Sequence, residues 1–163
     1  MQRIYLIGMM GSGKTTLGER LADKLGWRFI DLDSEITSAV GKSIPKIFEQ
    51  NGEAKFRTFE TEALKRTSMT KDTVIATGGG IVLEGKNCHL MRDSGEVVFL
   101  KTSRETLKLR LEGVTNRPLL NSEKSLEDIW DERKPLYENA ATFIVDGNES
   151  VEVCITSIIS RLA

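Results

Sequence analysis

Short runs of apolar and β-branched residues alternate along the chain with longer segments in which apolar residues recur every three or four positions. The first run, residues 3–7, is followed by Leu17, Leu21 and Leu25, whose spacing places them on one face of a helix. Strands that alternate with helices predict a three-layer α/β/α fold, with a five-stranded parallel sheet covered on both faces. The other four strands are expected at residues 27–33, 74–77, 96–100 and 142–145.

Several helix boundaries are indicated by residues that commonly begin or interrupt helices. Ser43 is a candidate N-cap with Pro45 in the first turn, and Asn51-Gly52 interrupts the helix that follows. Thr102 and Glu105 have the spacing of a capping box. The remaining helices are expected from Glu53 to Arg66, through Leu107 and Leu111, at about 125–139 and from Val151 to Leu162.

The second predicted strand ends in two carboxylates, Asp31 and Asp33. Because side chains alternate along a strand, both are expected on the same side of the sheet. Ligands of open α/β sheets bind at this end of the strands, where one carboxylate can orient the water shell of a metal and the other an acceptor hydroxyl. Taken alone, the pair is better explained as two solvated carboxylates.

A phosphate-binding loop is predicted directly after the first strand, where residues 8–15 match G-x-x-x-x-G-K-[ST]. Glycines let the backbone N–H groups point at phosphates, Lys14 adds a cation for the β- and γ-phosphates, and Thr15 offers a hydroxyl to Mg²⁺. The alternative is a chance glycine turn, which the strand–loop–helix context argues against. The candidate nucleotide-binding residues here are Gly11, Ser12, Gly13, Lys14, Thr15 and Thr16.

The length and composition of the chain limit the kinds of protein in which this loop can occur. The 163 residues are enough for a single domain, residues 1–163, and 23 Lys and Arg against 24 Asp and Glu exclude nucleic-acid or membrane partners held by bulk charge. The apolar run at residues 4–7 is far shorter than the ~20 residues of a spanning helix. Two cysteines, Cys88 and Cys154, are too few for a disulfide framework and fit a cytoplasmic location. We also expect a monomer.

Among phosphate-loop proteins, the sequence favours a small-molecule or nucleotide kinase. The N-K-x-D motif of switch GTPases is absent, and the D-x-x-G match at residues 23–26 lies in the helix after the phosphate loop. Protein kinases are excluded by length and by the lack of an H-R-D catalytic loop. Motor ATPases are much larger than this chain.

Three further features indicate the acceptor. The triplet Gly78, Gly79 and Gly80 follows a predicted strand and lets the backbone approach a small ligand. Arg57 and Arg133 can each hold a carboxylate in a two-pronged geometry. Separately, these features are explained as a flexible turn and two solvated charges. Together with an aspartate, they predict an acceptor with a carboxylate and hydroxyl groups.

These motifs, in this order, resemble those of the shikimate kinase family, phosphate-loop kinases of the nucleoside monophosphate kinase type. The resemblance implies transfer of the ATP γ-phosphate to the 3-hydroxyl of shikimate, with Mg²⁺, giving shikimate 3-phosphate and ADP on the way to chorismate and aromatic amino acids. The matching segments are residues 8–15, Asp31-x-Asp33, Phe56-Arg57-x-x-Glu60, Gly78–Gly80, Arg117-Pro118-Leu119-Leu120 and Arg133-x-Pro135-x-Tyr137.

The resemblance also implies roles at the acceptor. Asp33 would hold the ring hydroxyls and orient or deprotonate the attacking one, within an acceptor-binding segment of about residues 33–60. Arg57 and Arg133 would hold the carboxylate, and Gly78, Gly79 and Gly80 would close the pocket. Glu60 would support Arg57, because residues three apart share a helix face.

For the nucleotide, the implied catalytic residues are Lys14 and Arg117, beside Asp33. Arg117 would lie in a lid of about residues 112–124 and neutralise charge on the phosphates. Thr15 and, through water, Asp31 would bind the metal. Arg110 would stack on adenine, although a cation stabilised by the end of its helix is an equally simple explanation.

Two alternative functions stay open. The chain could phosphorylate another small hydroxy acid such as gluconate. It could also be a nucleotide-binding regulatory module without chemistry.

Overall fold

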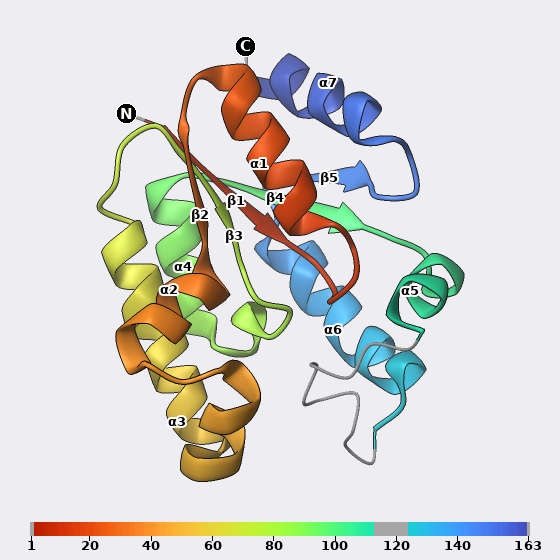
Figure 1. Cartoon of the computed structure of the whole chain (residues 1–163). Helices are drawn as coiled ribbons and strands as arrows, with labels where there is room; N and C mark the ends of the chain where they lie inside the picture. The colour runs from red at the N-terminus through yellow and green to blue at the C-terminus, as the bar shows by residue number, and fades with distance from the viewer. Residues whose placement is uncertain (1, 113–123, 163) are drawn as a thin grey trace.

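The computed structural model describes residues 2–112 and 124–162. Its strands form one five-stranded sheet in the order β2-β3-β1-β4-β5, and every neighbouring pair is parallel (Figure 1). The predicted number and direction of the strands are therefore confirmed. The strands are β1 (Arg3–Ile7), β2 (Arg28–Asp31), β3 (Thr73–Ala76), β4 (Glu96–Lys101) and β5 (Phe143–Asp146).

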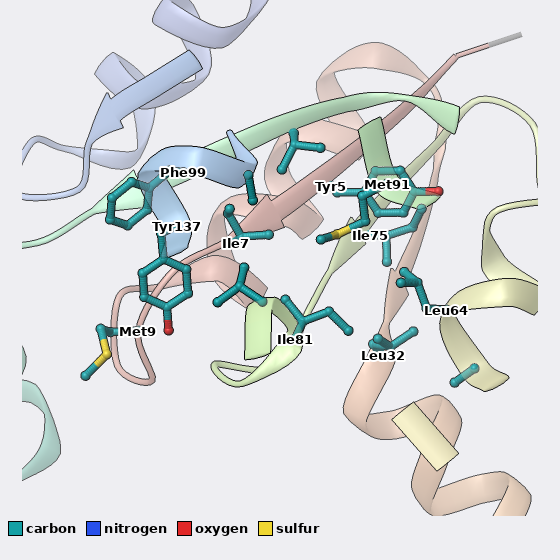
Figure 2. Packing of buried hydrophobic residues seen from close by; sticks show 14 of the residues in the cluster. Tyr5, Ile7, Met9, Leu32, Leu64, Ile75, Ile81, Met91, Phe99 and Tyr137 are labelled. Carbon is teal, nitrogen blue, oxygen red and sulfur yellow. The ribbon is translucent and has the colours of Figure 1, made fainter. Parts of the chain in front are cut away.

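Helices cover both faces of this sheet. Ile4 and Leu6 of β1 pack in one core cluster with α1 and α7, which lie side by side in Figure 1. Tyr5 and Ile7 of the same strand pack in a second cluster with α2, α3, α4 and α6 (Figure 2). The three predicted layers follow from this alternation. The helices are α1 (Lys14–Leu25), α2 (Leu32–Val40), α3 (Ile44–Thr67), the 3₁₀ turn η1 (Ile81–Leu83), α4 (Gly85–Ser94), α5 (Arg104–Leu111), α6 (Leu126–Ala140) and α7 (Val151–Leu162).

The predicted start and interruption of α3 are confirmed. Ser43 is the N-cap, and its hydroxyl accepts a hydrogen bond from the Lys46 N–H at 3.3 Å. Gly52 has φ 82° and ψ 166°, which breaks the helix into two parts. The kink divides the first turns of α3 from the part that carries Arg57 and Glu60.

The predicted strand at residues 27–33 is wrong at its end. Strand β2 ends at Asp31, whose carboxylate accepts a hydrogen bond from the Ser34 N–H at 3.1 Å and caps α2. Asp33 therefore lies in the first turn of α2 and does not alternate with Asp31 on a strand. An aspartate cap and acidic residues in the first turn both stabilise a helix start, which outweighs the strand pattern of the apolar residues.

Two other local predictions need correction. Helix α5 is capped by Ser103, whose hydroxyl accepts from the Thr106 N–H at 3.3 Å, so the predicted cap at Thr102, with Glu105 as its capping-box partner, is wrong. The segment 81–94, for which no element was predicted, forms η1 and α4. Within the described residues, no helix is long and apolar enough to cross a membrane.

The parallel sheet brings the functional segments to one edge. The loop after β1, Asp31 at the end of β2 and the glycine triplet after β3 all follow the carboxyl ends of neighbouring strands. This is the edge at which open α/β sheets bind ligands.

We predict that Gly95, between α4 and β4, cannot be replaced without loss of stability. A Cβ at this position would lie 2.5 Å from the carbonyl oxygen of Arg3, and backbone atoms cannot move aside cheaply. Gly95→Ala should lower the free energy of unfolding in urea by about 1–3 kcal/mol. Gly85→Ala, at the other end of α4, is the control, because a Cβ there meets no atom within 4 Å. Equal stability of the two variants would contradict this account.

Candidate active site

The loop between β1 and α1 curls because glycines stand where other residues would not fit. Gly13, the N-cap of α1, has φ 94°, a left-handed value that favours glycine. A Cβ on Gly8 would lie 2.7 Å from the carbonyl oxygen of Leu100. The curl places the N-terminus of α1 against a cavity of about 250 Å³. A helix N-terminus in this position favours an anion.

Lys14 is held across this loop by the loop itself. Its side chain is buried, and Nζ donates hydrogen bonds to the carbonyl oxygens of Gly8 at 2.6 Å and Met9 at 2.8 Å. These bonds keep the ammonium group beside the cavity, where it is placed to neutralise phosphate charge. The cavity, called here the phosphate cavity, is lined by Met10, Gly11, Gly13, Lys14, Thr15, Thr16, Asp31, Asp33, Thr77, Gly78 and Gly79. Ser12, the other predicted loop residue, is buried, and its N–H donates to the Met9 carbonyl.

Thr15 and Asp31 form the oxygen pair on which a magnesium site would depend. The Thr15 hydroxyl donates to the second carboxylate oxygen of Asp31 at 2.9 Å, and both residues line the phosphate cavity. Among the described residues, no three His, Cys, Asp or Glu side chains gather as a metal site. One hydroxyl and one carboxylate fit Mg²⁺, which commonly takes few protein ligands and completes its shell with water and phosphate oxygens.

A second cavity, of about 400 Å³, adjoins the phosphate cavity. The two share Met10, Asp33, Gly78 and Gly79, so Asp33 lies where they meet. A Cβ on Gly78 would lie 3.1 Å from Asp33 Oδ1 and 3.0 Å from Glu60 Oε2, which shows how closely both carboxylates approach the triplet. The residues that line this acceptor cavity are Met10, Asp33, Thr37, Ser43, Ile44, Pro45, Phe48, Phe56, Arg57, Glu60, Gly78, Gly79, Gly80 and Arg133.

Two buried guanidinium groups in the acceptor cavity have donor nitrogens without hydrogen-bond partners. Arg57 donates from Nη1 to Glu60 Oε1 at 3.0 Å and from Nη2 to Glu53 Oε1 at 3.2 Å. Buried Arg57 Nε, Arg133 Nη1 and Glu60 Oε2 have no hydrogen-bond partner. Buried polar atoms are normally paired, because an unpaired one costs about 1–3 kcal/mol. The two unpaired arginine nitrogens therefore indicate an anionic ligand.

Gly80 is required by the position of Arg57. A Cβ on Gly80 would lie 2.3–2.5 Å from three atoms of the Arg57 guanidinium group. Any larger residue would push this group out of place. The triplet and the arginine thus form one wall of the acceptor cavity.

The surroundings of the Glu60 carboxyl change its pKa in opposite directions. Burial raises the pKa of its carboxyl from about 4.5 to about 7, although the charge of Arg57 and its hydrogen bond act to lower the pKa. The nearby carboxylate of Asp33 raises the pKa further, and Arg133 lowers it slightly. Loss of hydration is the largest of these effects, because the side chain is 1% exposed.

Arg110 joins the phosphate loop to the segment after β5. Its Nη1 donates to the carbonyl oxygens of Gly11 at 3.3 Å and Ser12 at 3.1 Å, and Nη2 donates to Gly147 at 3.5 Å. The side chain lines a third cavity, of about 280 Å³, together with Ser12, Gly13, Thr16, Leu17, Leu100, Glu149, Val151 and Cys154. It is thus more than a cation at the end of α5, because it bridges two loops beside the phosphate cavity.

The structure brings most of the predicted site residues together and leaves one outside. Arg117 and residues 113–123 of the predicted lid lie outside the described residues. Six further residues of the acceptor cavity were not predicted as ligand contacts: Met10, Thr37, Ser43, Ile44, Pro45 and Phe48. Most of them are apolar, and apolar side chains carry no chemistry that marks them as ligand contacts. The Thr37 hydroxyl donates to the carbonyl oxygen of Asp33 in its own helix, so its sequence position carried no signal either.

Comparison with known proteins identifies close relatives. The family model described as shikimate kinase matches residues 10–163. A curated shikimate kinase from Persephonella marina is 39% identical over 163 residues, covering 99% of this chain and 99% of the relative. A shikimate kinase from Chlorobaculum parvum is 42% identical over 160 residues, covering 91% and 85%, respectively.

Solved structures agree with these relatives. The shikimate kinase from Acinetobacter baumannii in complex with shikimate superposes with a TM-score of 0.92 at 39% identity, covering 99% of this chain and 92% of that chain. A deoxyadenosine kinase from M. mycoides with bound dATP shares 16% identity and a TM-score of 0.63, covering 99% of both chains, and so resembles this chain in fold alone. The predicted fold of phosphate-loop kinases is confirmed.

The raised pKa of Glu60 predicts how stability changes with pH. Between about pH 4.5 and 7 the folded protein keeps a proton on Glu60 that the unfolded chain has released, so this group lowers stability as the pH rises through that window. The free energy of unfolding of the parent protein should therefore fall more between pH 5 and pH 8 than that of Glu60→Gln. Glu62→Gln, at an exposed position of the same helix, should follow the parent. Equal pH dependence in all three proteins would contradict the assignment.

Proposed function

Because the chain belongs to the shikimate kinase family, we propose that it transfers the γ-phosphate of ATP to the 3-hydroxyl of shikimate, giving shikimate 3-phosphate and ADP. It is an ATP-dependent kinase that acts on shikimate, in the pathway to aromatic amino acids. The observation that carries the proposal is the pair of buried, incompletely paired guanidinium groups, Arg57 and Arg133, in a cavity that adjoins the phosphate loop.

The acceptor is proposed to lie with its carboxylate on the two arginines. Arg57 Nε and Arg133 Nη1 supply the unpaired donors, and Glu60 holds Arg57 in position through Nη1. The ring hydroxyls then reach toward Asp33, where the acceptor cavity meets the phosphate cavity. The glycine triplet closes the pocket with backbone atoms only. Residues 33–60 thus act as the acceptor-binding segment of a single kinase domain.

Phosphoryl transfer between these cavities requires positioning and charge neutralisation more than covalent catalysis. Asp33 accepts a hydrogen bond from the attacking hydroxyl and takes its proton as the oxygen bonds to the γ-phosphorus. The bond from that phosphorus to the bridging oxygen breaks, and ADP leaves. Lys14 and the backbone of residues 11–16 hold the phosphates during the transfer. Arg117, outside the described residues, is proposed to neutralise charge on the transferred group.

Nucleotide contacts beyond the phosphates are proposed for Arg110, which lines the third cavity and would stack on adenine. Thr15 and, through water, Asp31 would hold Mg²⁺. When bound, this ion neutralises phosphate charge and orients the β- and γ-phosphates. We also propose a cytoplasmic monomer, consistent with two free cysteines, Cys88 and Cys154.

The direct test measures ADP release by the purified chain with Mg²⁺ and ATP. We expect release to depend on shikimate and to be negligible with gluconate at the same concentration. Shikimate 3-phosphate should accumulate in step with ADP. Turnover of gluconate in place of shikimate would favour the other hydroxy-acid kinase, and ATP binding without acceptor-dependent ADP release would favour a regulatory module.

Substitutions should distinguish the role of the phosphate cavity in turnover from the role of the acceptor cavity in shikimate binding. Lys14→Ala should lower kcat by at least about 100-fold, because the ammonium acts on phosphates whose charge changes during transfer. Arg57→Ala should raise the KM for shikimate by about 10–100-fold with a smaller change in kcat, because it removes ground-state binding. Arg20→Ala removes an exposed arginine paired with Glu152 and serves as the control. The reverse pattern of kcat and KM would contradict both assignments.

A further inference from the structure

Side chains from α6 and α4 bind the glycine triplet and the residue that follows it. The hydroxyl of Tyr137, on α6, donates a hydrogen bond to the carbonyl oxygen of Gly79. Asn87, on α4, donates from Nδ2 to the carbonyl oxygen of Ile81 at 3.1 Å. Gly79 lines both the acceptor and the phosphate cavity, whereas Tyr137 and Asn87 line neither. Neither side chain therefore forms part of the cavity walls, although the Tyr137 hydroxyl also lies within hydrogen-bond reach of Arg133.

The bond to Tyr137 determines the direction of a whole peptide unit. The carbonyl of Gly79 and the N–H of Gly80 belong to one planar peptide group, and no peptide bond in the described chain is cis. In a trans peptide these two groups point in opposite directions. A carbonyl held by Tyr137, which is not part of either cavity wall, thus directs the N–H of Gly80 away from Tyr137, and Gly80 itself lines the acceptor cavity. Within the described residues, the N–H of Gly80 donates no backbone hydrogen bond, so it is available to a ligand.

A turn made of three glycines needs such support, because glycine restricts its own backbone least of all residues. The backbone bonds of the turn run from the Ile81 N–H to Gly78 and from the Leu83 N–H to Gly80. They leave the Gly79 carbonyl to the tyrosine. Without that bond, rotation of the peptide group between Gly79 and Gly80 would turn its N–H out of the cavity at little cost.

Tyr137 is well suited to hold this carbonyl. Its side chain is fully buried and packs against Phe99, with ring centroids 5.0 Å apart (Figure 2). Burial raises the pKa of its hydroxyl to about 12, so the group stays a neutral donor over the working pH range. Arg133 lies four residues earlier on α6, and a Cβ on Gly79 would lie 3.5 Å from its Nη1. One face of α6 therefore positions both a charged group and the backbone of the same pocket.

We propose that Tyr137 is a positioning residue for the acceptor: by holding the Gly79 carbonyl it keeps the backbone N–H of Gly80 directed at the hydroxy-acid substrate. The inference rests on the proposed function, since it assigns a role within the same pocket. It adds a residue outside the pocket to the set that determines acceptor affinity.

The test compares Tyr137→Phe with Tyr5→Phe. These are the two tyrosines of the chain. Both are fully buried, and Tyr5 makes its own hydroxyl hydrogen bond with Ser94 Oγ at 2.7 Å, away from both cavities. Each variant loses one buried hydroxyl, so a purely structural effect should be similar in the two. Steady-state kinetics with varied shikimate or varied ATP, and thermal unfolding with and without shikimate, supply the readouts.

For Tyr137→Phe we expect the KM for shikimate to rise about tenfold, the typical effect of losing one buried hydrogen bond. The KM for ATP should change less than about twofold, and the rise of the unfolding midpoint caused by shikimate should shrink. Tyr5→Phe should keep the parent values of both KM constants, even where its unfolding midpoint falls. Tyr137→Met, which also lacks the hydroxyl, repeats the measurement if the phenylalanine variant does not fold.

Other outcomes overturn the inference. An unchanged KM for shikimate in Tyr137→Phe, or equal increases in the KM for shikimate and ATP, would show that the hydroxyl serves only stability. Equal effects of the Tyr137 and Tyr5 substitutions would show the same. Failure of the parent protein to bind or phosphorylate shikimate would overturn the proposed function itself, and this result is visible before any variant is made.

Discussion

Two buried cations and one buried carboxylate share the acceptor cavity, and the protein interior disfavours charge without compensation. Arg57 and Arg133 are 9% and 5% exposed, and each keeps a nitrogen without a partner. Glu60 binds Arg57, yet burial still raises the pKa of its carboxyl to about 7. The empty cavity therefore keeps guanidinium donors without partners, and an anionic ligand would accept hydrogen bonds from them. The carboxylate of the proposed acceptor meets this need.

The parallel sheet places the acceptor cavity beside the phosphate cavity, so that an acceptor can lie next to the nucleotide phosphates. Strands β1, β2 and β3 end at the same edge, so the phosphate loop, α2 and the glycine triplet meet there. Asp33 and Gly79 line both cavities as a result. Donor and acceptor sites that share walls satisfy the main requirement of phosphoryl transfer, which is alignment of the two reacting groups.

The accuracy of the sequence-based predictions depended on how local the controlling interactions are. The break at Gly52 was predictable, because glycine favours the left-handed backbone that it adopts there. The position of Asp33 was not, since the apolar pattern continues past the point where Asp31 caps α2. Helix α4 has few buried apolar residues, and its buried Asn87 binds the carbonyl of Ile81 and the hydroxyl of Thr61. Buried polar contacts of this kind leave no periodic signal.

The sequence by itself determined the phosphate loop, the five strands in alternation with most of the helices, and the pairing of Arg57 with Glu60. Each depends on residues close together in the chain, through glycine conformation, apolar periodicity or the spacing of one helical turn. Only the tertiary structure decided which distant residues complete the site. Tyr137 reaches Gly79 across 58 positions, and Arg110 reaches Gly11 across 99. These contacts depend on how α5 and α6 pack against the sheet, and that packing is set by the whole core, not by any local motif.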